Sequence, residues 1–235
     1  STLFPYTTLF RSGLRPGHLS ALISHKAAEA GAGLLTSLTK LVNLMLSGSV
    51  PECARPVLYG AAVFALSKKD GGIRPIAVGS TLRRLATKVG AGPLSAEIGH
   101  SLRPVQLGVS SRGGCEAVVH AARRYLEGTT QKRVIFKVDM ANAFNSIRRD
   151  IFLSAAKERA QELYALLWQA YSEPSNLLYG DTGLVCATGI QQGDPFGPAL
   201  FSLGIDSLTR ELELELNARY LDDGTPEIGR ASCRE

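Results

Sequence analysis

The sequence predicts an α+β fold. Segments with apolar residues at the spacing of helices alternate with short apolar runs that end at Gly or Asp, as strands do. The 235 residues are 45% hydrophobic, which excludes a disordered chain and is enough for a sizeable core. No internal repeat or low-complexity linker divides the sequence, so we expect one compact unit.

Helical patterns dominate the first half. Residues 18–46 carry apolar side chains at helical spacing, and Gly31–Gly33 is expected to interrupt them, giving one or two helices. A helix-start signal follows at residues 49–52. Two further helices are predicted over residues 80–99 and 113–128.

Strand patterns stand between these helices and after them. Residues 61–66 and 73–78 flank a charged, Gly-rich turn and predict a β-hairpin. Residues 134–138 predict a short strand that ends on Asp139. An amphipathic helix in two pieces (146–171), a hairpin turning at Gly180-Asp181 (176–186), a helix started by Pro195 (195–216) and a brief strand (217–221) complete the chain.

Composition narrows the classes of function. Twenty-six basic against twenty-one acidic residues give +5 and an isoelectric point near 9.1, which permits a nucleic-acid partner without requiring one. The four cysteines lie far apart and form no zinc or disulfide pattern, which favours a reducing compartment. No long apolar segment or signal sequence is present, so we expect an intracellular protein with no membrane contact.

The two ends are expected not to belong to the natural protein. Residues 1–12 can be encoded by a widely used sequencing adapter, and residues 227–235 by its reverse complement. We therefore expect residues 13–226 to be the biological part of a reading frame cut at both ends.

Three carboxylates follow predicted strands. Asp139 ends one strand, and Asp222 and Asp223 end another. Oxygen ligands that converge from neighbouring strands suit Mg²⁺, and two such ions can assist phosphoryl transfer. The alternative is that these residues only end strands or cap the following turn.

Two other segments could bind a nucleoside triphosphate. Lys68, Lys69 and Arg74 place three cations on one hairpin, which suits phosphates or, alternatively, a solvated turn. Residues 191–195 open a helix with Gly193, where a ligand could approach closely; an ordinary loop before a Pro-initiated helix explains them equally well.

Four ordered blocks resemble reverse transcriptases, most closely those of non-LTR retrotransposons. VIFKVDMANAFNSI, GIQQGDPFGPALFSL and RYLDDG look like motifs A, B and C, and GIRPIAVGSTLRRLATKV looks like the preceding finger motif. The resemblance covers nearly all of residues 34–226. It implies the fingers (13–132, with N-terminal helices) and palm (133–226) of a right-hand polymerase, the palm a small antiparallel sheet packed on helices and the thumb absent.

The resemblance also implies roles for individual residues. The three carboxylates would hold two Mg²⁺ ions, with Mn²⁺ possible, and catalyse addition of dNTPs to a DNA primer on an RNA template. Phe144, five residues after Asp139, would exclude a 2′-hydroxyl. Further implied contacts are Arg74, Lys68, Lys69, Gln192 and Gly193 for the nucleotide, Tyr220 for the primer, and Arg83, Arg84, Arg123 and Arg124 for nucleic-acid backbones.

Three features depart from the family pattern. Asn145 replaces a common Asp, and Arg219 places a charge in the usually apolar approach to motif C. The expected end at Pro226 would leave residues 220–223 on an unpaired hairpin arm, so we expect a marginally stable, weak or inactive fragment.

Other functions are open at this point. An RNA-dependent RNA polymerase typically carries Asp at the position of Phe144, which disfavours that class. A non-catalytic nucleic-acid-binding remnant of a mobile element is a further alternative, and group II intron maturases and telomerase-type polymerases share the same core. A nuclear location follows from the resemblance alone.

Overall fold

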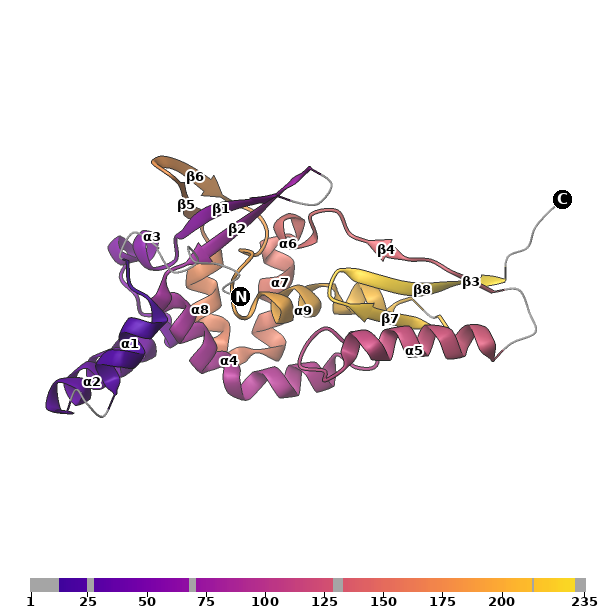
Figure 1. The fold of residues 1–235 in the computed structure, drawn as a ribbon, viewed down its shortest axis with the longest axis horizontal. Coiled ribbons are helices and arrows are strands. Elements are labelled where there is room, and N and C mark those ends of the chain that lie inside the picture. The colour runs from indigo at the N-terminus through magenta and orange to yellow at the C-terminus, as the bar shows by residue number, and fades with distance from the viewer. Residues whose placement is uncertain (1–12, 25–27, 68–70, 129–132, 213, 231–235) are drawn as a thin grey trace.

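A computed structural model describes residues 13–24, 28–67, 71–128, 133–212 and 214–230. It has the predicted α+β architecture. Figure 1 shows two separate sheets, one formed by β1, β2, β5 and β6 and the other by β3, β4, β7 and β8, with the main group of helices beside and between them.

The N-terminal helical region forms two helices, α1 (Pro16–Ile23) and α2 (Ala28–Leu46). The predicted interruption at Gly31–Gly33 is wrong, because α2 runs through both glycines. Val42 and Met45 are buried where α2 packs against α4 and α8. This packing outweighs the helix propensity lost at two glycines, about 1 kcal/mol each.

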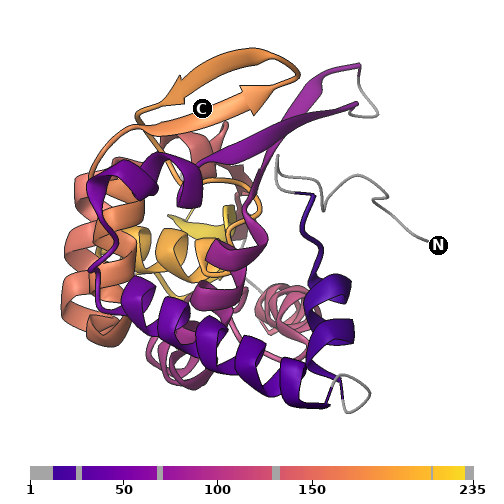
Figure 2. The same cartoon turned by 90° about the vertical axis from the view of Figure 1, so that its left-hand side faces the viewer.

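The first sheet joins the two predicted hairpins. Its strands run in the order β2-β1-β5-β6, with bounds β1 (Ala61–Ser67), β2 (Ile73–Gly79), β5 (Ser175–Tyr179) and β6 (Thr182–Cys186). The strands of each hairpin are antiparallel, and β1 pairs in parallel with β5. Figure 2 shows the two hairpins together above the helices, so this sheet combines strands from both sides of residue 133.

The helices beneath that sheet are η2 (Glu52–Ala54), α3 (Arg55–Leu58), α4 (Thr81–Ser101), α7 (Arg149–Arg159), α8 (Gln161–Tyr171) and α9 (Gly197–Arg210). The hydrophobic core lies among α4, α7, α8 and α9, and Val42 and Met45 of α2 pack into it. Phe152, Phe196 and Phe201 are almost completely buried among them. The predicted helix over 195–216 is therefore shorter at both ends, whereas the predicted division of 146–171 into two helices is confirmed after the short α6 (Ala143–Ser146).

The second sheet is centred on β8 (Asp223–Arg230), which pairs with β7 (Asn217–Tyr220), β4 (Val138–Asp139) and β3 (Arg133–Ile135). The predicted strand before Asp139 is thus split into two pieces. The expected unpaired arm is also wrong: β8 returns along β7 from Tyr220↔Asp223 to Asn217↔Pro226. The hydrogen bonds between strands use only backbone groups. The strand can therefore continue to residue 230, although residues 227–230 are expected to be encoded by the adapter.

Helix α5 (Gly114–Glu127) packs along β7 on one side of this second sheet. Across the described part of the chain, no helix has both the length and the apolar character needed to cross a membrane.

Candidate active site

The three predicted carboxylates lie at one end of the second sheet. Asp139 on β4 is the direct register partner of Asp223 on β8, and Asp223 is also opposite Tyr220 on β7. Asp222 lies in the turn between β7 and β8. Residues directly opposite in antiparallel strands share a face, so Asp139 and Asp223 present two like charges to each other, which destabilises the pair unless a cation is near.

A cavity of about 400 Å³ opens beside these acids and is lined by Asp139, Asp222, Arg74, Phe144 and Gln192, among others. A second cavity of about 460 Å³ shares Asp222, Arg74, Phe144 and Gln192 with the first and adds Gly193. The two cavities therefore adjoin. The fold brings together residues from β2, β4, the α6 segment, the loop before α9 and the β7–β8 turn.

The donor chemistry of the acids suits a hard divalent cation. Within the described residues, the carboxylates of Asp139 and Asp222 have no hydrogen-bond or ion-pair partner, although both line the cavity. Asp223 has a cationic neighbour, with its Oδ1 3.8 Å from Nζ of Lys137. No cluster of three acidic, His or Cys side chains close enough to hold a metal occurs in the described ranges, so two of the three predicted ligands share the cavity and the third faces Lys137.

Phe144 lies at the cavity wall and contacts both α9 and the loop before it. Its ring stacks on Phe201 of α9 with centroids 4.7 Å apart and planes 25° from parallel. Its carbonyl accepts a 2.6 Å hydrogen bond from the Ile190 backbone N–H. Asn142, just before α6, has φ 52°, a left-handed conformation that Asn tolerates better than most residues and that turns the chain into this helix.

The loop before α9 requires glycine at residue 193. Gly193 has φ +117°, and a Cβ there would lie 2.7 Å from the backbone oxygen of Ala77 on β2. A side chain is excluded both by conformation and by space. The close approach places Gln192 and Gly193 at the cavity that Arg74 and Ile76 of β2 also line.

Arg83 was predicted to contact a nucleic-acid backbone, but the structure buries it inside the protein. Its guanidinium is buried, with 3% of the side chain exposed, and Nη2 lies 2.8 Å from Oδ2 of Asp194. Nη1 donates to Oε1 of Gln191 (2.6 Å) and to the carbonyl of Tyr59 (2.8 Å). These bonds occupy Arg83 inside the protein, where phosphate cannot reach it; it fixes the two residues that flank Gln192 and Gly193.

Tyr171 completes this buried network. Its hydroxyl donates a 2.7 Å hydrogen bond to Oδ2 of Asp194, and the Arg83 guanidinium lies 5.1 Å from its ring centroid. Burial, together with the charge of Asp194, holds the pKa of Tyr171 well above its ordinary value, so the phenol stays a neutral donor. Asp194 and Tyr171 were missed in the sequence, where only the Gln-Gln-Gly-Asp-Pro run offered a signal.

Gln106 was also missed, and it holds the turn that carries Asp222. Its Oε1 accepts from the backbone N–H of Leu221 (2.8 Å) and of Gly108 (2.9 Å), and its Nε2 donates to the carbonyl of Leu221 (3.1 Å). Leu221 has φ 58°, a strained conformation for a branched residue. No local pattern marks Gln106, because its partner is 115 residues away.

The other predicted residues are dispersed. Tyr220 is 39% exposed beside the acids, Arg84 lies at a different cavity between α1 and α4, and Lys68 and Lys69 lie outside the described residues. Arg123 and Arg124 are exposed on α5. The charge predicted to be costly, Arg219, is buried, and its Nε and Nη1 have no hydrogen-bond partner among the described residues.

Comparisons with known proteins identify the family of the chain. The family model described as "Reverse transcriptase (RNA-dependent DNA polymerase)" matches residues 66–225. The chain is 29% identical over 206 residues to the "Retrovirus-related Pol polyprotein from type-2 retrotransposable element R2DM" of Drosophila melanogaster, covering 82% of this chain and 19% of that protein. It is 28% identical to the "Retrotransposable element SLACS 132 kDa protein" of Trypanosoma brucei gambiense, covering 72% and 15%. The chain thus spans less than a fifth of the length of these relatives.

Solved structures with a related shape include an apo telomerase from Candida tropicalis, with a TM-score of 0.47, 11% identity, and coverage of 74% of this chain and 44% of that one. A partial Cas6-RT-Cas1–Cas2 complex gives a TM-score of 0.43 and 16% identity, covering 90% of this chain and 36% of that one.

Proposed function

Because the chain belongs to the reverse transcriptase family, as its motifs led us to expect, we propose that it is the fingers and palm of an RNA-directed DNA polymerase of a non-LTR retrotransposon. Its substrates would be dNTPs, a DNA primer and an RNA template. The related proteins named above belong to retrotransposable elements, which supports this assignment.

One observation carries the proposal. Two carboxylates without partners among the described residues, Asp139 and Asp222, share a cavity with Arg74, Phe144 and Gln192, each of which the resemblance assigned to the nucleotide site. The alternative interpretation, that an acid merely ends a strand or caps a turn, could explain the position of Asp139 or of Asp222 taken singly. It does not explain why a cation, an aromatic ring and an amide from three other segments converge on the same space.

Asp139, Asp222 and Asp223 would hold two Mg²⁺ ions. When bound, these ions would neutralise the triphosphate and lower the pKa of the primer 3′-hydroxyl. The protein itself fixes the backbone of all three acids, through the β4–β8 register and the Gln106 clamp on the turn. Phosphoryl transfer depends mainly on such positioning, with no covalent enzyme intermediate.

The remaining cavity residues would bind the incoming nucleotide. Arg74 is exposed at the start of β2 and can form bidentate bonds to phosphate oxygens, assisted by Lys68 or Lys69. Gln192 and Gly193 present an amide and a bare backbone to the base and sugar. Phe144, fixed on Phe201, would leave no room for a 2′-hydroxyl and so select deoxynucleotides.

The nucleic acid would extend beyond the nucleotide cavity. Tyr220 would contact the primer end, and its register pairing with Asp223 supports this role. Arg123 and Arg124 on α5 would contact phosphates of the bound strands from an exposed helix face.

Primer extension on an RNA template tests the proposal. Because β7 is paired with β8, the expected loss of activity from an unpaired arm no longer applies. We therefore expect the chain to add dNTPs in the presence of Mg²⁺, and Asp139→Ala to abolish addition. Asp150→Ala is the matched control, because Asp150 of α7 is an exposed acid that pairs with Arg148 just before the helix, and its loss should leave extension unchanged. Preferential use of NTPs would instead indicate an RNA polymerase. RNA binding without incorporation of any nucleotide would indicate a non-catalytic remnant.

The sugar-selection role has its own variant. Phe144→Val shortens the side chain at the cavity wall without adding charge, so we expect NTP incorporation to rise relative to dNTP incorporation. Unchanged discrimination in an active variant would remove Phe144 from this role.

A further inference from the structure

A third cavity lies outside the candidate active site, where α1, the end of β2 and the start of α4 meet. It has a volume of about 360 Å³. Leu19, Ile23, Val78 and Leu85 supply apolar side chains to its wall, and Leu19 and Val78 are buried. The Thr81 hydroxyl donates a 2.6 Å hydrogen bond to the carbonyl of Leu14, which ties the chain before α1 to the start of α4. The cavity is therefore built by defined contacts between these elements.

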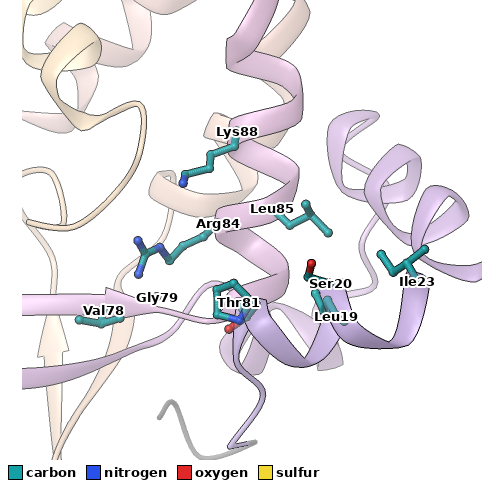
Figure 3. Close-up of a pocket in the computed structure, with 10 residues that line it drawn as sticks. Leu19, Ser20, Ile23, Val78, Gly79, Thr81, Arg84, Leu85 and Lys88 are labelled. Carbon is teal, nitrogen blue, oxygen red and sulfur yellow. The ribbon is translucent and has the colours of Figure 1, made fainter. Parts of the chain in front are cut away.

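Two cations lie at one rim of this cavity. Figure 3 shows Arg84 and Lys88 extending from α4 on the side of Val78, whereas Leu85 extends from the other side of the helix toward Ser20 and Ile23 of α1. Among the described residues, neither cation has a hydrogen-bond or ion-pair partner. An apolar wall beside two free cations suits a ligand that has both a flat apolar part and an anionic part, as a nucleotide does.

Strand β2 links this cavity to the candidate active site. Side chains two residues apart on a strand share a face. Arg74 and Ile76 line the active-site cavity, and Val78, next on the same face, lines the third cavity. Arg74 and Val78 are about 13 Å apart along the strand, which corresponds to about four stacked nucleotides at 3.4 Å per nucleotide.

We propose that this third cavity binds one nucleotide of the single-stranded template, about four nucleotides ahead of the site of addition. The base would lie against Leu19, Val78 and Leu85, and Arg84 and Lys88 would contact the adjoining phosphates. The inference rests on the proposed polymerase function, because it needs a template strand that leaves the active-site cavity along β2.

Binding of primer–template duplexes to the 235-residue chain tests the inference without requiring activity. The two duplexes differ only in the template 5′ overhang, about two or about eight nucleotides, on either side of the four-nucleotide span. We expect the longer overhang to bind at least about fivefold more tightly, because the base would bury apolar surface against Leu19, Val78 and Leu85.

Two variants locate that gain. Ser20→Trp fills the mouth of the cavity without changing charge, and it should remove the gain from the long overhang. Arg84→Ala/Lys88→Ala should also remove it and reduce the slope of log K against log salt by about 1.4, as expected for two lost phosphate contacts on a single strand. Lys40→Ala/Lys157→Ala removes two exposed charges from α2 and α7 and should preserve the gain.

The outcomes separate the two proposals. The assignment of the cavity would be overturned if Ser20→Trp still bound the long overhang as much more tightly than the short one as the unmodified chain does. It would also be overturned if the Lys40→Ala/Lys157→Ala control lost that difference in affinity as completely as Arg84→Ala/Lys88→Ala. Equal binding of both duplexes by the unmodified chain would overturn this inference and leave the polymerase proposal intact. Failure to bind either duplex would contradict both.

Discussion

Replacing Arg219 with methionine should stabilise the protein. Arg219 is 4% exposed on β7, and its Nε and Nη1 are buried without a partner in the described part of the chain. Its guanidinium lies over Gly224 of β8, where a Cβ would be 3.0 Å from Nη1. Burial lowers the pKa of Arg219, because the charged form is removed from water.

The magnitude follows from the two orphaned donors. Each buried, unsatisfied hydrogen-bond donor costs about 1–3 kcal/mol. Methionine keeps an unbranched, flexible stem and introduces no donor, so Arg219→Met should raise the free energy of unfolding by at least about 2 kcal/mol. For a chain of this size that corresponds to an increase in Tm of roughly 4–8 °C.

Urea unfolding and thermal melts at pH 6 and pH 8 measure this effect. Arginine stays protonated throughout that range, so the gain should be the same at both values. Arg148→Met, which changes an exposed arginine, should alter stability by no more than about 0.5 kcal/mol. A lower free energy of unfolding in Arg219→Met would refute the reasoning, because it would show that the guanidinium has a stabilising partner.

Three further predictions concern the residues that hold the site. Gln106→Leu removes the bonds that fix Leu221 in the turn before Asp222, so kcat for primer extension should fall about tenfold or more while KM for dNTP changes little; an unchanged kcat would contradict the clamp. Asp194→Ala leaves Arg83 buried without its counter-charge and should cost about 3–5 kcal/mol in urea unfolding, with a loss under 1 kcal/mol counting against the network. Burial raises the pKa of Tyr59 to about 12 from an unfolded value near 10, so the stabilisation is present below pH 10 and is lost as pH rises toward 12. In alkaline unfolding, Tyr59→Phe should reduce that pH dependence, and an identical dependence in the variant would exclude Tyr59 as its source.

Short-range signals in the sequence predicted much of the fold and of the candidate site. Apolar periodicity located both hairpins and most helices, since neighbouring residues determine which faces an element has. The acids at strand ends and the Gly-rich segment before α9 were found for the same reason. The order of the motifs then predicted the family, which the matching family model confirms.

Only the tertiary structure decided which way individual side chains face. Arg83 and Arg84 are adjacent and chemically identical, yet one is buried against Asp194 and the other lines a cavity beside α1. A step of one residue turns a helix by about 100°, and partners more than 100 residues away determine which direction is the interior. The orientations of Gln106 and Arg219 likewise depend on distant segments: Gln106 binds Leu221, 115 residues away, and Arg219 is buried in the second sheet. The sequence itself determined the elements and the chemistry they carry, and long-range packing determined which of those groups meet.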